Sequence, residues 1–202
     1  MATANAQLKQ TLRRELRARR RALSSHQQRL AAQRLIRQVV RLPGYARVRS
    51  IALYWAMDGE IDVTPLMHRL MRDGKTVYLP VLQPQRLALW FRPWQPTSFM
   101  RDNRFGIPEP QQGRRLAPWA LDWVLLPLVG FDDLGGRLGM GGGFYDRTFA
   151  ARARWPRQPR LIGVAHQCQQ VEPIPLESWD IPLAAVVTDA QRYEWDLPSL
   201  AG

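Results

Sequence analysis

An uninterrupted apolar run is the strongest constraint on the fold of this chain. Residues 122–129 read DWVLLPLV, a short segment rich in Val and Leu. A strand with one face in water alternates apolar and polar residues, whereas a strand with both faces covered reads as a continuous apolar run. The run therefore predicts a β-strand that is buried on both faces of a sheet.

The first 41 residues are helical in pattern. Residues 5–41 predict one or two helices, and Ser24 and Ser25 mark a break with a new N-cap. An apolar stripe that is most simply core is formed here by Leu30, Leu35, Ile36 and Val39. This segment is expected to pack as an N-terminal helical part on the rest of the molecule.

Strands and helices alternate through the remainder of the chain. A helix is predicted at residues 63–72, starting at Asp62, and strands are predicted at residues 48–55, 75–82, 87–91, 124–129, 161–165 and 184–187. The first two strands and the helix between them form a β-α-β unit, for which a right-handed crossover is expected. Residues 93–118, rich in Pro and Gln, predict a loop. The alternation predicts an α/β three-layer sandwich with a mainly parallel sheet, in a single domain spanning residues 1–202.

Four closely spaced glycines follow the buried run, at Gly139, Gly141, Gly142 and Gly143. Glycine permits positive φ angles and a close approach to a ligand, so successive N–H groups can converge on an anion. Residues 144–155 lack Gly and Pro and predict a helix whose N-terminal amides face the same anion. Arg137 adds a planar cation suited to phosphate, and Asp146 is a nearby carboxylate that could hold Mg²⁺.

The spacing of these glycines excludes two familiar nucleotide loops. Gly136 and Gly141 have the separation found in a P-loop, but Gly142 and Gly143 follow where Lys and Ser or Thr should stand. In the dinucleotide fingerprint a third glycine or alanine would replace Phe144. A connector that only turns the chain remains the alternative to an anion site.

Side chains that follow the predicted strands should meet at one cleft, because ligands gather beyond the carboxyl ends of strands in open α/β sheets. Glu60 follows the first strand, residues 137–146 follow the central strand, and His166 follows the strand at 161–165. Glu60 could equally be a solvated loop acid. Aromatic side chains that could stack on a flat ligand or belong to the core are Tyr54, Trp55, Trp90, Phe91 and Phe105.

The glycine segment also resembles the signature of a known family. Residues 135–147, GGRLGMGGGFYDR, match the pattern G-x-R-L-G-x-G-x-G-[FY]-Y-D-R of the 5-formyltetrahydrofolate cyclo-ligase (methenyltetrahydrofolate synthetase) family throughout. Three further segments are similar to the family in order and approximate spacing: Lys9-Gln-Thr-Leu-Arg13, Glu60-Ile61-Asp62, and Trp179-Asp180-Ile181-Pro182-Leu183 followed by Val186-Val187-Thr188. The resemblance covers nearly the whole chain.

The resemblance implies an ATP site with Mg²⁺. Lys9 and Arg137 would be catalytic, and Asp146 and Asp180 would carry the metal ion. The residues implied to bind ATP are Lys9, Arg13, Arg137, Leu138, Gly139, Met140, Gly141, Gly142, Gly143, Phe144 and Tyr145.

The resemblance also implies a folate site and a reaction. Glu60 would face the folate, and the residues bordering the substrate would be Trp55, Glu60, Met140, Gly141, Gly142, Gly143 and Phe144. The implied reaction is the ATP-driven closure of 5-formyltetrahydrofolate to 5,10-methenyltetrahydrofolate, with release of ADP and phosphate, through an N5-iminium phosphate. The implied substrate is the folate with or without a polyglutamate tail, and the implied state is a monomer. Val63 departs from the family, which usually has Thr there, and Met140 and Phe144 depart in side-chain type.

Composition fits a globular protein and leaves one competing function open. No apolar run reaches the length of a membrane span, the N-terminus lacks the apolar stretch of a signal peptide, and the single cysteine, Cys168, fits a reducing cytoplasm. The net charge of +12 raises nucleic-acid binding as an alternative, although no recognised nucleic-acid motif accompanies it. The first helix alone is crowded by Arg13, Arg14, Arg17, Arg19, Arg20 and Arg21, for which an Arg-rich surface is the simplest interpretation. A second alternative to an enzyme is a nucleotide-binding regulator whose active site is inactive.

Overall fold

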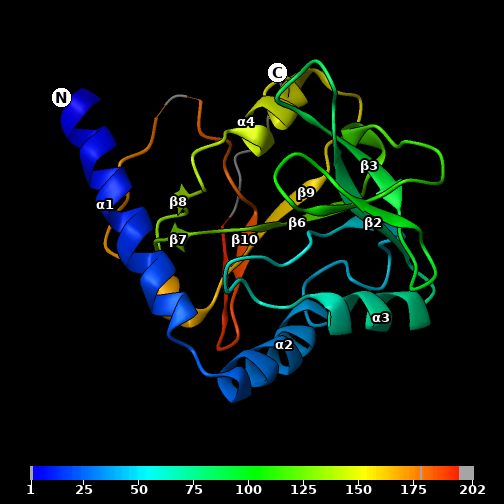
Figure 1. Ribbon diagram of the computed structural model, residues 1–202, viewed down its shortest axis with the longest axis horizontal. Helices are drawn as coiled ribbons and strands as arrows, with labels where there is room; N and C mark the ends of the chain where they lie inside the picture. The colour runs from blue at the N-terminus through cyan, green and yellow to red at the C-terminus, as the bar shows by residue number, and fades with distance from the viewer. Residues whose placement is uncertain (1, 178, 196–202) are drawn as a thin grey trace.

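The centre of the molecule is a seven-stranded sheet with the order β11-β10-β9-β6-β1-β2-β3 (Figure 1). The computed structural model describes residues 2–177 and 179–195, so Met1, Ser178 and the last seven residues of the predicted domain lie outside it. The strands of this sheet are β1 (Ser50–Ala52), β2 (Thr76–Leu82), β3 (Leu89–Pro93), β6 (Trp123–Pro127), β9 (Arg160–Val164), β10 (Ala185–Val187) and β11 (Arg192–Glu194).

The sheet is mainly parallel, as the sequence predicts. β1, β2, β6, β9 and β10 pair in parallel, and antiparallel neighbours flank them, with β3 beside β2 and β11 beside β10. The predicted central strand is β6, whose residues Trp123 to Leu126 are all buried. It lies between β1 and β9 in the middle of the sheet, which explains its uninterrupted apolar sequence.

Helices cover both faces of the sheet and form three layers. Figure 1 shows α2 (Ser25–Val39) and α3 (Thr64–Arg72) on one face and the short α4 (Phe144–Phe149) on the other. The α2 and α3 side holds one buried cluster, which includes Leu35, Leu66 and Leu125, and the α4 side holds a second, which includes Phe91, Leu126 and Phe149. Neighbouring strand residues point to opposite faces, so β6 contributes to both clusters.

The break predicted between the first two helices is confirmed. Ser24 is the N-cap of α2: its hydroxyl accepts from the Gln27 N–H at 3.3 Å, and the Gln27 side chain accepts from the Ser24 N–H at 2.8 Å. This capping box satisfies two donors that a helix start would otherwise leave free. Leu35 and Val39 of the predicted stripe are buried, while Leu30 and Ile36 are partly buried.

The first helix, α1 (Ala2–Arg21), packs along one end of the sheet rather than on either face (Figure 1). Its Leu16 is fully buried with Val129, Leu138 and Ile174. The helix comes close to Gly130, where a Cβ atom would lie 2.4 Å from the Leu16 Cδ1 atom. A side chain at position 130 would therefore force the Leu16 side chain to shift. None of the described helices is long and apolar enough to cross a bilayer.

Two sequence predictions are wrong in detail. The predicted helix over residues 144–155 ends at Phe149, because the chain turns through η2 (Arg152–Arg154) and packs the Trp155 ring against Phe149, with 5.9 Å between ring centroids. Residues 93–118 are not only loop, since they contain a small ribbon of β4 (Met100–Asp102) and β5 (Pro108–Pro110) and the turn η1 (Pro118–Ala120).

Further short elements lack any prediction. These are β11, the two-residue pair β7 (Gly130–Phe131) and β8 (Arg137–Leu138), and η3 (Gln167–Gln169). Several predicted strands are also longer than the observed ones, and β1 covers three of the eight residues predicted for it. Helix α3 begins at Thr64 with Val63 as its N-cap, so the predicted start at Asp62 is too early, although the Asp62 side chain accepts from the Thr64 N–H at 2.9 Å.

Candidate active site

The glycine segment connects β8 to α4. Gly141 and Gly143 have φ angles of +91° and +61°, and the chain can follow this path because both residues are glycine. Among the residues that the structure describes, the backbone N–H groups of residues 140–143 donate no hydrogen bond. These donors are available to an anion or to water. Because α4 has only six residues, an anion here would depend on the loop amides and nearby cations more than on a long helix, contrary to the sequence expectation.

Two cations of α1 lie against the loops of the predicted ATP site. The Arg13 Nε atom donates to the Gly139 carbonyl at 2.8 Å. The Lys9 Nζ atom lies 3.4 Å from the Asp180 carboxylate and 3.8 Å from that of Glu177. Burial lowers the pKa of Arg13, and the negative charge of Asp180 opposes this effect. One helix thus brings Lys9 and Arg13 to the glycine loop and to the segment that carries Asp180.

The Arg137 side chain is buried and binds two groups of the protein. Its guanidinium forms an ion pair with Asp146, and its Nε atom donates to the Ile181 carbonyl at 3.0 Å. Arg152 of η2 is also buried, and its pKa is lowered by burial and by the positive charge of Arg137. Two buried arginines whose charges repel each other make this region favourable for a bound anion.

The two predicted metal ligands lie on either side of Ile181. Asp146 accepts weakly from the Ile181 N–H at 3.4 Å and pairs with Arg137, while Asp180 accepts from the Glu177 N–H at 2.9 Å and pairs with Lys9. Within residues 2–177 and 179–195 no three His, Cys, Asp or Glu side chains gather to hold a metal ion. Mg²⁺ is commonly held by one or two carboxylates together with substrate phosphates and water. Two carboxylates beside a cationic loop fit that kind of site.

Glu60 is a partly buried carboxylate in a loop after β1. Its side chain is 11% exposed, its Oε2 atom accepts from the Met57 N–H at 3.0 Å, and its Oε1 atom lies 3.8 Å from Arg20. Burial raises the pKa of Glu60 to about 7, although the Met57 hydrogen bond and the Arg20 charge both lower it. Burial and the charge of Glu60 raise the pKa of Tyr54 and that of Tyr145. Glu60 is therefore a largely enclosed acid rather than a fully solvated one.

Residues from the predicted cleft meet around this loop. The His166 Nε2 atom lies 3.2 Å from the Gly59 carbonyl, and burial lowers the pKa of His166. Met140 of the glycine segment is half exposed, with its sulfur 4.0 Å from the Arg20 guanidinium. The loop with Glu60, the glycine segment and His166 therefore lie together, as the carboxyl-edge argument predicts.

Some predicted residues occupy other surroundings. Trp55 packs, partly buried, against the core on the α2 and α3 side, and the Leu138 side chain is buried next to Leu16. Phe144 is partly buried and meets the exposed Phe105 ring edge-on, with centroids 5.6 Å apart. Val63 is buried in the core, so an apolar group fills the place where the family usually has a hydroxyl.

Sequence reasoning missed Arg20 and Asp58. Arg20 is fully buried, and Asp58 accepts hydrogen bonds from Arg17 at 2.7 Å, from Arg20 at 2.9 Å and from Arg21. Burial alone would raise the pKa of Asp58, but these hydrogen bonds lower it to about 2. The available signal was spacing, because Lys9, Arg13 and Arg20 recur at helical intervals on one face of α1.

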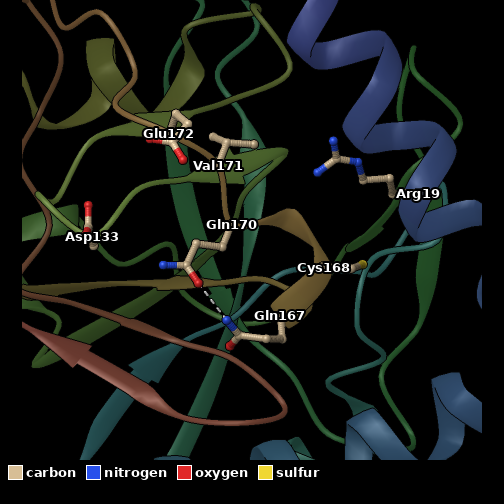
Figure 2. A pocket seen from close by; sticks show the side chains of 7 residues that line it. All are labelled: Arg19, Asp133, Gln167, Cys168, Gln170, Val171 and Glu172. Carbon is tan, nitrogen blue, oxygen red and sulfur yellow. Dashed lines mark hydrogen bonds between the residues drawn. The ribbon is translucent and has the colours of Figure 1, made fainter.

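One cavity of the molecule lies away from these residues. A cavity of about 550 Å³ separates Arg19 of α1 from the segment at 167–172 (Figure 2). Gln167 and Gln170 are hydrogen-bonded to each other there, and Cys168 faces the same space. Burial raises the pKa of the Cys168 thiol, which does not favour a nucleophile. None of the predicted site residues lines this cavity.

The fold and the site together define an α/β protein in which a cationic glycine loop and a buried carboxylate are joined by one N-terminal helix. The profile of the 5-formyltetrahydrofolate cyclo-ligase family matches residues 5–189. The chain belongs to this family and is an enzyme of it.

Named relatives and solved structures agree with this assignment. The chain is 44% identical to the 5-formyltetrahydrofolate cyclo-ligase of Escherichia coli K12, over 89% of this chain and 100% of the relative, and 42% identical to that of Haemophilus influenzae, over 89% and 96%. Its fold is similar to the 5,10-methenyltetrahydrofolate synthetase of Aquifex aeolicus, with a TM-score of 0.80 and 31% identity over 96% of this chain and 97% of that one. The synthetase of Mycoplasma pneumoniae has a TM-score of 0.72 and 25% identity, over 90% and 98%.

Proposed function

We propose that the protein closes 5-formyltetrahydrofolate to 5,10-methenyltetrahydrofolate in a reaction that consumes ATP and requires Mg²⁺. The observation that carries this proposal is the placement of Lys9, Arg13 and Arg137 around one glycine loop, with Asp146 and Asp180 paired to two of these cations. Cations, free amides and carboxylates are the groups that a site for a metal-bound polyphosphate requires.

The chemistry needs positioning and charge more than a nucleophilic side chain. The formyl oxygen is a poor leaving group, so transfer of the γ-phosphoryl group to it forms an N5-iminium phosphate and ADP. N10 then attacks the formyl carbon and loses its proton, the C–O bond breaks, and phosphate leaves. Lys9, Arg13 and Arg137 would balance the charge of the transferring phosphoryl group.

The remaining groups have separate roles in this proposal. Asp146 and Asp180 would hold Mg²⁺, which neutralises charge on the phosphates. Glu60 would face the folate, and a carboxyl with a pKa of about 7 can hold or release a proton near neutral pH. The backbone of residues 139–143 would line the space between ATP and the folate.

The cellular context is proposed on the same basis. The chain would act as one domain and as a monomer in the cytoplasm, with ATP and a folate, with or without a polyglutamate tail, as its ligands. The charge of +12 would favour both anionic ligands without a nucleic-acid partner.

The experiment mixes the purified protein with 5-formyltetrahydrofolate, Mg²⁺ and ATP and follows the near-ultraviolet absorbance of methenyltetrahydrofolate. We expect growth of that band only when ATP and Mg²⁺ are both present. Mixtures that lack ATP or contain EDTA are the controls. A flat trace from protein shown to be folded by circular dichroism would overturn the proposal.

A further inference from the structure

Arg20 is the largest fully buried side chain of the described residues, with no exposed surface. Its guanidinium donates to the Asp58 carbonyl at 2.8 Å, to the Asp58 carboxylate at 2.9 Å and to the Leu128 carbonyl at 3.2 Å. It also lies 3.8 Å from Glu60 and 4.0 Å from the sulfur of Met140. All of these groups belong to loops at the candidate active site.

Packing alone does not require an arginine in this place. A buried guanidinium loses its hydration, and an apolar residue of similar volume often serves stability equally well. Removal of one partner from such a network, however, leaves buried charge without compensation. Arg20 therefore needs an explanation beyond filling space.

The geometry of α1 supplies that explanation. Lys9, Arg13, Leu16 and Arg20 are spaced by four, three and four residues, which places them on one face of the helix. Lys9 and Arg13 contact the proposed ATP side, Leu16 anchors the helix in the core, and Arg20 contacts the loop of Glu60. One rigid helix thus spans both halves of the site.

Asp58 shows that this loop is held in an uncommon conformation. Its φ angle is +55°, the only positive φ among the described residues that are not glycine. A residue with a side chain adopts this conformation at some cost, and surrounding contacts must maintain it. The buried contact that does so is Arg20, which binds both the carbonyl and the carboxylate of Asp58, whereas Arg17 and Arg21 bind only the carboxylate and from more exposed positions.

We propose that Arg20 is a positioning residue, which holds Glu60 toward the folate and fixes its distance from the phosphate-binding side chains of α1. The inference rests on the proposed function, because it assigns Glu60 to the folate. Arg20 itself need not touch either substrate.

The charges around Glu60 give this role a second consequence. Arg20 of α1 provides the positive charge, and the other groups that face Glu60 are Asp58 of the same loop, Tyr54 after β1 and Tyr145 of α4. Loss of the Arg20 charge makes ionisation of Glu60 less favourable, so the pKa of Glu60 rises. In a plot of kcat/KM against pH, the limb that depends on the ionisation of Glu60 should then move to more alkaline pH.

The test compares the full-length wild-type protein with Arg20→Gln and with a control, Arg21→Gln. Arg21 contacts the same Asp58 carboxylate from an exposed position on the same helix. For Arg20→Gln we expect the KM for 5-formyltetrahydrofolate to rise about tenfold or more, while the KM for ATP changes less than about twofold. Arg21→Gln should resemble the wild type in both constants.

A second variant keeps the test decisive if Arg20→Gln does not fold. Asp58→Asn keeps the size of the side chain, and Asn adopts positive φ readily, but the carboxylate that Arg20 binds is lost. It should raise the folate KM in the same direction, with a smaller change in the ATP KM. If Arg20→Gln is unfolded by circular dichroism, Asp58→Asn decides the question.

The pH dependence of kcat/KM for the folate separates positioning from general destabilisation. The Glu60 limb is identified as the one absent from Glu60→Gln, and it should move to higher pH in Arg20→Gln but not in Arg21→Gln. The role of Arg20 would be overturned if the folded variants kept an unchanged KM for the folate, or if the Glu60 limb of their pH profile stayed in place. Turnover by the wild type would still support the proposed function in that case. Absence of turnover in the wild type would overturn both.

Discussion

Arg137 connects the two halves of the proposed phosphate site, because its guanidinium binds the Asp146 carboxylate on one side and the Ile181 carbonyl on the other. Such a planar, forked group suits phosphate oxygens better than a single ammonium does. We therefore expect the Arg137 guanidinium to exchange these internal partners for the oxygens of a phosphoryl group when ATP binds.

We predict that Arg137→Ala and Lys9→Ala each lower kcat/KM for ATP by about a hundredfold, since each removes a charge that stabilises the transferring phosphoryl group. Steady-state assays at saturating folate measure the effect. Arg14→Ala, at an exposed position of α1, is the control and should retain full activity. Normal turnover in Arg137→Ala would exclude Arg137 from the phosphate site.

We predict that Asp146→Asn raises the Mg²⁺ concentration needed for half-maximal rate, because an amide oxygen carries no charge with which to bind a hard cation. A titration of turnover against free Mg²⁺ measures the shift. Glu15→Gln, which removes an exposed carboxylate of α1, is the matched control. An unchanged titration would remove Asp146 from the metal site.

The four glycines and Arg137 were predicted from the residues themselves, whereas Lys9 and Arg13 were implied only by the family resemblance. The sequence did not predict Arg20 or Asp58. Six arginines crowd α1, and although spacing places Arg20 on the face of Lys9 and Arg13, the sequence does not show that this face meets the Asp58 loop.

Among the elements, α2 owes its start to a local signal. Ser24 and Gln27 satisfy each other's backbone donors, so this helix boundary is encoded in four consecutive residues. The end of α4 has no comparable local signal, because it depends on the contact between Trp155 and Phe149.

The β4 and β5 ribbon was missed for a related reason. Proline lacks an N–H and argues against a central strand, yet Pro108 and Pro110 lie in a two-stranded ribbon outside the main sheet. The strands of the main sheet other than β11 were predicted, and the central strand β6 most directly, because burial on both faces leaves a continuous apolar sequence that needs no knowledge of tertiary contacts.

We predict that Ser24→Ala lowers the free energy of unfolding by about 1 kcal/mol, through loss of the α2 cap, and leaves kcat and KM unchanged. Urea denaturation followed by circular dichroism measures the loss. Ser25→Ala changes the adjacent residue, which does not cap the helix, and should cost less. Equal losses in the two variants would contradict the cap.

For the molecule as a whole, burial of Glu60 makes stability depend on pH. The pKa of Glu60 is about 7 in the folded protein and 4.5 in the unfolded chain. Between these two pH values the folded protein keeps the proton of Glu60, whereas the unfolded chain has released it. Stability is therefore favoured below pH 4.5 and falls as pH rises through 7. His166 acts oppositely, because its lowered pKa makes the fold lose stability as pH falls below its ordinary value of 6.5.

We predict that Glu60→Gln becomes more stable relative to the wild type as pH rises from 5 to 8, by roughly 2 to 3 kcal/mol, since the amide cannot ionise. Comparison of the two proteins cancels the effect of His166. Urea denaturation at several pH values measures the difference. If the difference in free energy of unfolding between the two proteins did not change with pH, the pKa of Glu60 would not be raised by burial.

The single face of α1 that carries Lys9, Arg13 and Arg20 also limits how the chain can change in length. Each residue of an α-helix advances the direction of the side chains by about 100°, so one inserted residue between Arg13 and Arg20 turns the two ends of this face apart. An alanine inserted after Arg14 should therefore abolish turnover, whereas one inserted after Gln85, in the exposed turn between β2 and β3, should leave it intact. We thus expect insertions and deletions to be tolerated in exposed turns away from the site, such as the one at Gln85, but not in the part of the first helix that joins the two halves of the proposed site.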